Sequence, residues 1–260
     1  MILDNERGKI MKLIALGSGG WMPTESRHTA SYLVDTGESL IILDSGCGLS
    51  RLSNHLDILN KYEEINIIYS HYHLDHIIGL SYIGNWSKEK RLNIYGPGKA
   101  LGFTGCQDVI SSLITPPFFP FTIDKFAKEV SMRDYDLQGF KIGSIPIKIT
   151  AQIHSGKSFG ISLGDHLHYS TDTTTLENTF KEAEGTKLLL HECWTIANEG
   201  SKDHSSFEEI NNMLSKYKIQ KLGLIHINPN WNVDKFEELT SFFEHNPNIV
   251  VVEDEMVFEI

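Results

Sequence analysis

Four side chains suited to metal binding stand within six positions of the sequence, at His71, His73, Asp75 and His76. They directly follow an apolar run at residues 65–69, which is typical of a buried strand. Imidazole nitrogens and carboxylate oxygens are the usual ligands of zinc in hydrolytic sites, where one coordination position stays open for water. The spacing therefore predicts a metal centre, in which Asp75 and His76 face a second ion about 3.5–4 Å from the first.

The elements that must position this motif alternate between strand and helix. Strands are expected at residues 12–16, 32–34, 40–43, 65–69, 92–95, 145–153, 159–163, 167–170, 188–190, 222–227 and 249–252. Helices are expected at residues 49–62, 100–114, 206–217 and 233–243. No Pro/Gly/Ser-rich linker divides the pattern, so we expect one domain at residues 11–260, a short tail at residues 1–10, and two sheets flanked by helices.

Composition excludes several classes of protein. Of the 260 residues, 40% are hydrophobic and 22% are charged, which is ordinary for a globular domain. The net charge of −11 opposes stable binding to nucleic acid, because that affinity comes mainly from Lys and Arg. A secretory signal and a membrane span are both absent from the pattern, and the three cysteines are isolated. These features predict a cytoplasmic protein without a membrane partner, located in the host cytoplasm if a phage encodes it.

The segment His71-Tyr72-His73-Leu74-Asp75-His76 resembles the His-x-His-x-Asp-His signature of the metallo-β-lactamase superfamily. The resemblance implies an α/β fold, the four-layer αββα sandwich, and a hydrolase with two divalent metal ions, by default Zn²⁺ with Mn²⁺ as the alternative. By this resemblance, one metal would be held by His71, His73 and His154, the other by Asp75, His76 and His226, and Asp172 would bridge them.

Further motifs resemble the ribonuclease Z-like branch of that superfamily. They are the loop at residues 16–24, the Asp44-Ser45-Gly46-Cys47-Gly48 loop, Glu192, and His204-Ser205-Ser206. The resemblance implies phosphodiester chemistry, in which His204 donates a proton to the leaving oxygen, Glu192 orients His204, and Asp75 orients the attacking water. The spacing from Glu192 to His204 is shorter than in that branch.

The chain lacks the basic, Gly-rich arm with which full-length ribonuclease Z grips transfer RNA, so we expect a small phosphodiester substrate. Its size and layout resemble the anti-Pycsar cyclic nucleotide phosphodiesterases, which implies hydrolysis of a 3′,5′-cyclic nucleotide by a homodimer. Three alternatives stay open: a transfer RNA 3′-processing endonuclease, a lactonase or thioesterase-type hydrolase, and a non-catalytic protein with structural metals. Residues 115–126 are expected to form a lid or a dimer contact. Trp194 and Tyr169 could stack a nucleobase, but we expect them to pack in the core and assign them no role in the site.

Overall fold

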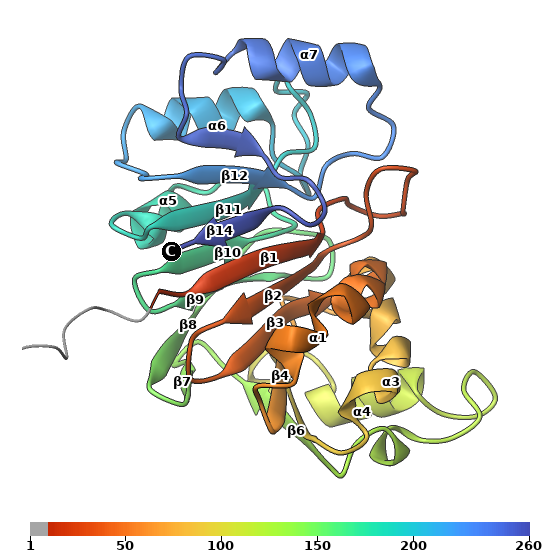
Figure 1. Ribbon diagram of the computed structural model, residues 1–260. Coiled ribbons are helices and arrows are strands. Elements are labelled where there is room, and N and C mark those ends of the chain that lie inside the picture. The colour runs from red at the N-terminus through yellow and green to blue at the C-terminus, as the bar shows by residue number, and fades with distance from the viewer. Residues whose placement is uncertain (1–9) are drawn as a thin grey trace, which may run out of the picture.

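The computed structural model describes residues 10–260, which form two seven-stranded sheets packed face to face (Figure 1). In spatial order, the first sheet contains β14 (Val257–Glu259), β1 (Lys12–Gly17), β2 (Ser31–Asp35), β3 (Leu40–Ser45), β4 (Glu64–Ile68), β5 (Arg91–Pro97) and β6 (Glu129–Tyr135). The second contains β13 (Ile249–Val251), β12 (Leu222–Ile225), β11 (Leu188–Glu192), β10 (Leu167–Ser170), β9 (Phe159–Leu163), β8 (Ile145–Ala151) and β7 (Phe140–Ile142). β2 and β3, which contain the strands expected at residues 32–34 and 40–43, pair antiparallel as a hairpin.

Alternation along the strands divides the apolar side chains between two faces of each sheet. In β1, Leu13 joins the cluster between the sheets, whereas Ile14 joins a separate cluster under the helices. In β11, Leu190 faces the inter-sheet cluster and Leu189 faces outward. Successive strand residues point to opposite faces, so both faces of these strands must be covered.

Helices cover the two outer faces. The first sheet is covered by α1 (Leu56–Leu59), α2 (Leu74–Ile77), α3 (Gly84–Ser87) and α4 (Cys106–Leu113), and the second by α5 (Glu177–Ala183), α6 (Phe207–Leu214) and α7 (Val233–Ser241). In Figure 1, α6 and α7 lie at the top, and α1, α3 and α4 lie at the lower right, with the strands between them. The predicted αββα sandwich is therefore confirmed.

Two predicted helices are wrong over much of their length. Residues 49–62 were expected as one helix, but Cys47–His55 is a 3-10 helix and only Leu56–Leu59 is α-helical. In this segment the side chains of Asn54 and His55 form hydrogen bonds with the distant Glu255. The Ser53 hydroxyl donates a hydrogen bond to the carbonyl oxygen of Ser50. These polar side-chain contacts fix a tighter turn than apolar spacing alone suggests.

The predicted helix at residues 100–114 is interrupted by glycines. A 3-10 turn at Lys99–Leu101 ends at Gly102, and α4 begins only after Gly105. Gly102 and Gly105 have φ of 90° and 127°, which are values that favour glycine and cannot continue a right-handed helix. The sequence patterns also missed β6, β7, β14 and α5, which are short or carry many polar residues.

Residues 115–126 lie over the helices of the first sheet. Phe119, Phe121 and Phe126 pack against one another, and Phe118 is 80% exposed. Apart from Ile10, the predicted tail lies outside the described residues. We retain residues 11–260 as one predicted domain. None of the helices in residues 10–260 is both long and apolar enough to cross a bilayer.

Candidate metal centre

The predicted ligands gather where strands end. His71 follows β4 by a short turn, His73 is the N-cap of α2, and α2 itself carries Asp75 and His76. From the second sheet, His154 follows β8, Asp172 follows β10 and His226 follows β12. β10 and β12 both run parallel to β11, so their carboxyl ends share one edge, where open α/β sheets bind ligands.

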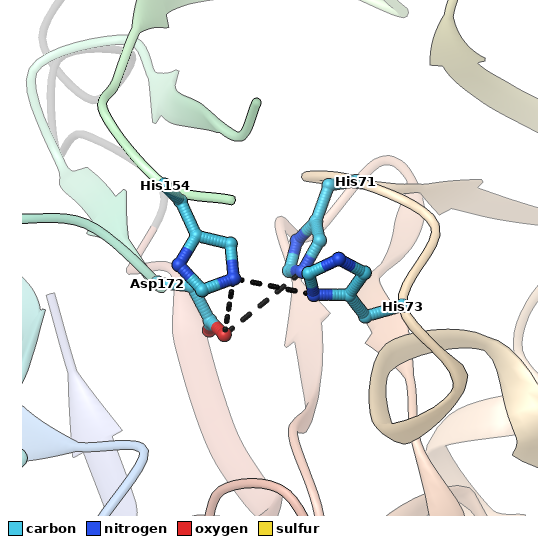
Figure 2. Close-up of side chains that lie close together, drawn as sticks. All are labelled: His71, His73, His154 and Asp172. Atoms are coloured by element: carbon cyan, nitrogen blue, oxygen red, sulfur yellow. Dashed lines mark hydrogen bonds and ion pairs between the residues drawn. The ribbon is translucent and has the colours of Figure 1, made fainter. Parts of the chain in front are cut away.

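Four of these residues form a first donor set, which Figure 2 shows converging on one point. Nδ1 of His73 lies 3.2 Å from Nε2 of His154. Oδ2 of Asp172 lies 3.5 Å from that His154 nitrogen and 3.9 Å from Nε2 of His71. Two donors come from each sheet, so the set lies on the seam between the two halves of the fold.

The second donor set contains Asp75, His76, Asp172 and His226. Oδ1 of Asp172 lies 3.1 Å from Nε2 of His76 and 3.1 Å from Nε2 of His226. Oδ2 of Asp75 lies 3.4 Å from each of the same two nitrogens. One carboxylate oxygen of Asp172 thus lies at each set, which is the position that a bridging ligand would need.

The two sets fit divalent cations. Ligand atoms held tetrahedrally at about 2.0–2.1 Å from an ion lie about 3.3 Å apart, close to the separations found here. Nε2 of His71 and Nε2 of His76 are buried and have no hydrogen-bond partner within the described residues. Buried polar atoms normally have partners, so these two nitrogens are arranged for a cation that would lie between them and the carboxylates.

A second layer of hydrogen bonds orients the imidazoles. The buried Asp44 accepts a 2.7 Å bond from Nδ1 of His76 and also binds the Ser70 hydroxyl and amide. His154 donates from Nδ1 to the carbonyl oxygen of Asp203 at 2.9 Å. In both rings the proton is thereby fixed on Nδ1. Nε2 is then unprotonated, and its lone pair is available to a metal in the donor set. Asp44 itself has φ of 52°, which is rare for a side-chain-bearing residue.

Charge in the centre favours cations as well. Burial raises the pKa of Asp172, but the positive potential of His226 and His76 outweighs burial and holds that pKa well below its usual range. Burial lowers the pKa of His71 well below its usual range, which keeps this imidazole neutral. Ionised carboxylates and neutral imidazoles are the forms that bind metals, and His226 differs from His71 in this respect. Burial lowers the pKa of His226, but the charge of Asp172 and the hydrogen bond to Asp75 outweigh burial and raise that pKa to about 10, so a cation would displace a proton from this ring.

Glu192 and His204 form a third group beside the second donor set. Nδ1 of His204 donates to Oε2 of the fully buried Glu192 at 2.9 Å, and the amide of Thr173 donates to its other oxygen. Burial lowers the pKa of His204, but the hydrogen bond and charge of Glu192 outweigh it, so the pKa is raised. The structure therefore brings together the two residues whose short sequence spacing departed from the family pattern.

A cleft of about 230 Å³ opens onto these groups. Its lining is Trp21, His73, Asp75, His154, Ser155, Asp172, Trp194, His204 and His226. Of the two aromatic residues weighed from sequence, Tyr169 is buried with its hydroxyl on Asp44, whereas Trp194 stacks on His204 with ring centroids 4.5 Å apart. Trp21 had no signal in the sequence pattern beyond its place after Gly19 and Gly20.

A larger cavity of about 740 Å³ lies elsewhere, between α3 and residues 119–126, and contains none of the predicted site residues. Within residues 10–260, no member of the 115–126 segment lines the cleft described above. The segment therefore does not cover the donor sets of its own chain in this structure.

The chain is similar to known proteins in sequence and in fold. Residues 11–246 match the family "Anti-Pycsar protein Apyc1". Ribonuclease Z of Pyrococcus furiosus is 23% identical over 87% of this chain and 89% of its own length. Among solved structures, the metallo-β-lactamase-fold protein YhfI of Bacillus subtilis has a TM-score of 0.76 at 20% identity, covering 97% of this chain and 100% of its own. A diphosphatase of the PhnP family has a TM-score of 0.74 at 18% identity, covering 96% and 98%.

The family match covers most of the chain, and the neighbouring structures share its two-sheet fold. The histidine and aspartate clusters indicate divalent-metal binding. The chain therefore belongs to the anti-Pycsar protein Apyc1 family, within the ribonuclease Z-like branch of the metallo-β-lactamase superfamily, and is a metal-dependent hydrolase.

Proposed function

We propose that this chain hydrolyses a small phosphodiester, a 3′,5′-cyclic nucleotide, to the nucleoside monophosphate. The observation that carries the proposal is the Glu192–His204 pair beside two donor sets that share Asp172. Phosphodiester hydrolysis needs positive charge against the phosphate oxygens and a proton donor for the leaving oxygen. The donor sets would hold the cations that supply the positive charge, and the Glu192–His204 pair would supply the proton.

The proposed ligands are His71, His73 and His154 for one divalent ion, Asp75, His76 and His226 for a second, and Asp172 for both. We propose zinc as the native metal, with manganese as the alternative, because histidine-carboxylate sites accept both. Bound divalent ions supply Lewis acidity, which makes water a better nucleophile near neutral pH and offsets phosphate charge.

The residues of the chain divide the remaining work. His204 donates a proton to the ribose oxygen as the bond between that oxygen and phosphorus breaks, while the attacking water bonds to phosphorus on the opposite side and releases one proton to solvent. Glu192 holds the His204 ring through Nδ1, which leaves Nε2 as the donating nitrogen. Asp75 accepts a hydrogen bond from the water, and its own carboxylate is steadied by the amide of Trp21 at 2.9 Å.

Size and charge favour a small substrate. The cleft of about 230 Å³ is below the range of about 300–1,000 Å³ that is usual for drug-sized ligands. The net charge of −11 repels a long polyanion, whereas a single phosphate can be met by the local centre. A homodimer and a cytoplasmic location remain predictions from the resemblance and the composition.

Transfer RNA 3′ processing is the second candidate. It is favoured by one observation, the similarity to ribonuclease Z across 87% of this chain. The same donor sets and proton donor would serve an RNA phosphodiester, so only the substrate separates the two candidates.

The test is a turnover assay on metal-loaded protein with purine and pyrimidine 3′,5′-cyclic mononucleotides, precursor transfer RNA and an acyl lactone. We expect cyclic nucleotide hydrolysis by the wild type and none by the Asp75→Ala, His76→Ala double variant. His204→Ala should lose about 10²–10⁴-fold in turnover, the usual contribution of general acid catalysis, with metal content unchanged. The matched control is His245→Ala, because the His245 side chain is 92% exposed and lies outside the cleft.

Either arm can contradict the proposal. RNA or lactone cleavage without cyclic nucleotide turnover would replace the substrate and leave the donor sets standing. Full activity of His204→Ala would remove the proton-donor role. An acyl substrate would also tolerate that variant, so the lactone arm identifies the replacement.

A further inference from the structure

The loop that follows β1 carries an exposed indole to the mouth of the cleft. Trp21 lines the cleft together with His204 and the donor residues, yet 63% of its surface is exposed. Large aromatic side chains usually bury most of their surface, so an exposed one beside a reactive centre has apolar area available for a ligand.

The backbone holds this indole in one place. Trp21 has φ of 61°, in the left-handed region that bulky residues rarely adopt. Its amide donates to Oδ2 of Asp75 at 2.9 Å, and the amide of the preceding Gly20 donates to the carbonyl oxygen of Ile227 at 3.1 Å. Residues persist in this region when the surrounding structure over-determines them, which is common at ligand-binding sites.

Gly20 explains how the loop approaches so closely. A Cβ atom at this position would lie 2.4–2.7 Å from ring atoms of His226, so any larger residue would push the loop off the centre. The loop is therefore fixed against both donor residues that it touches, Asp75 and His226, and Trp21 projects from that fixed point.

Among the aromatic residues Trp21, Tyr169 and Trp194, Trp21 is the one that is mostly exposed and not stacked on another ring. Tyr169 is fully buried, and Trp194 stacks on His204 at 4.5 Å with an interplanar angle of 17°. Within residues 10–260, the Trp21 indole pairs with no other ring. A planar group of a ligand whose phosphate lies at the donor sets can thus stack on Trp21 without displacing His204, the proposed proton donor.

We propose that Trp21 is the stacking platform for the nucleobase and that it determines the substrate class as nucleoside phosphodiesters over base-free ones. This inference rests on the proposed phosphodiester hydrolysis. Base–aromatic stacking tolerates every base, because each base has a π-face. Trp21 therefore selects for a base while discriminating weakly among bases, with purines favoured for their larger ring area.

The experiment compares 3′,5′-cyclic AMP with a base-free analogue, 1-O-methylribose 3′,5′-cyclic phosphate, on metal-loaded Trp21→Ala, Trp21→Phe and wild type. Trp21→Ala should raise KM for cyclic AMP at least about tenfold, equal to about 1.4 kcal/mol, and change the base-free substrate less than about twofold. Trp21→Phe should retain most of the wild-type preference. Phe242→Ala is the matched control, because Phe242 is 60% exposed and lies outside the cleft.

Intrinsic fluorescence gives a second readout, which does not depend on turnover. Titration of the loaded wild type with AMP should quench tryptophan emission, and Trp21→Phe should lose most of this quenching. A Trp21→Ala variant that affects both substrates equally, or neither, would overturn the stacking role. If the wild type hydrolyses neither substrate, the proposed function fails, and the titration alone then decides: quenching that needs Trp21 supports the platform, and no quenching overturns it.

Discussion

Members of both donor sets line the same cleft as His204, but the donors and the proton donor are held in different ways. The donors follow strand ends of both sheets, and hydrogen bonds to Asp44 and to the carbonyl oxygen of Asp203 fix the rings of His76 and His154. His204 comes from the loop between β11 and α6, its side chain is 20% exposed, and one buried carboxylate orients it. The donor sets are thus part of the sheet framework, which we call the frame. The proton donor His204 is held by a loop at the edge of the cleft, which we call the rim.

This difference orders the effects of substitution. Changes in the frame should remove metal and activity together. Changes at the rim should leave metal bound and alter only the step that needs a proton. Changes in the elements that carry the rim should alter stability more than catalysis.

The largest effect is expected for Asp172→Asn. The amide keeps the shape of the carboxylate but removes the charge that both donor sets share, so metal content should fall and turnover should drop by about 10³-fold or more. Mass spectrometry measures the metal content per chain, and steady-state kinetics measures the turnover. Asp165→Asn is the control, because its side chain is 87% exposed on a turn. Full metal content with full activity would show that Asp172 does not belong to the frame.

An intermediate effect is expected for Glu192→Gln. His204 donates its proton only while protonated, so activity falls as pH rises through its pKa. Glu192 raises that pKa, and removal of its charge should move the alkaline limb of the pH profile to lower pH. We expect roughly tenfold lower turnover at alkaline pH with metal content unchanged.

Glu255→Gln is the control for this variant. It alters another His–carboxylate pair, since Glu255 lies 2.8 Å from His55, away from the cleft. An unmoved alkaline limb in Glu192→Gln would break the comparison, because the limb would then not report on His204.

The smallest effect is expected for Ser206→Ala. Ser206 caps α6 through a complete capping box with Glu209, just after His204. Loss of the cap should cost about 1 kcal/mol, or about 2–4 °C in Tm, and change turnover less than about twofold. Thermal unfolding of the metal-loaded protein measures this, with Ser215→Ala at the other end of α6 as the control. A large loss of turnover would mean that the helix start positions His204 directly.

Sequence could predict the frame because its signal is local. His71, His73, Asp75 and His76 stand close together after a buried strand, and this combination of ligand types and spacing is typical of a metal site. Asp172 and His226 are different, since each alone is typical of a turn or a strand end. Only their order along the chain, read through the family resemblance, predicted the positions where the structure places them.

The remaining features depend on tertiary contacts, which the spacing of apolar residues along the sequence cannot predict. The Glu192–His204 contact requires the intervening loop to fold back across 12 positions. Trp21 acquires its place from a left-handed backbone and from the hydrogen bond that its amide donates to Asp75. β14 is recognisable as a strand only because β1 offers it an edge, with Leu13 opposite Phe258.

Each donor set takes two residues from each sheet, and this arrangement links the chemistry to the lifetime of the protein. A cation held there would join residues that lie far apart along the chain, and it would have no comparable partner in the unfolded chain. By mass action, every tenfold rise in free metal above the dissociation constant adds about 1.4 kcal/mol to the free energy of unfolding. Metal supply in the cell would therefore set how long the chain resists proteases as well as how fast it turns over its substrate.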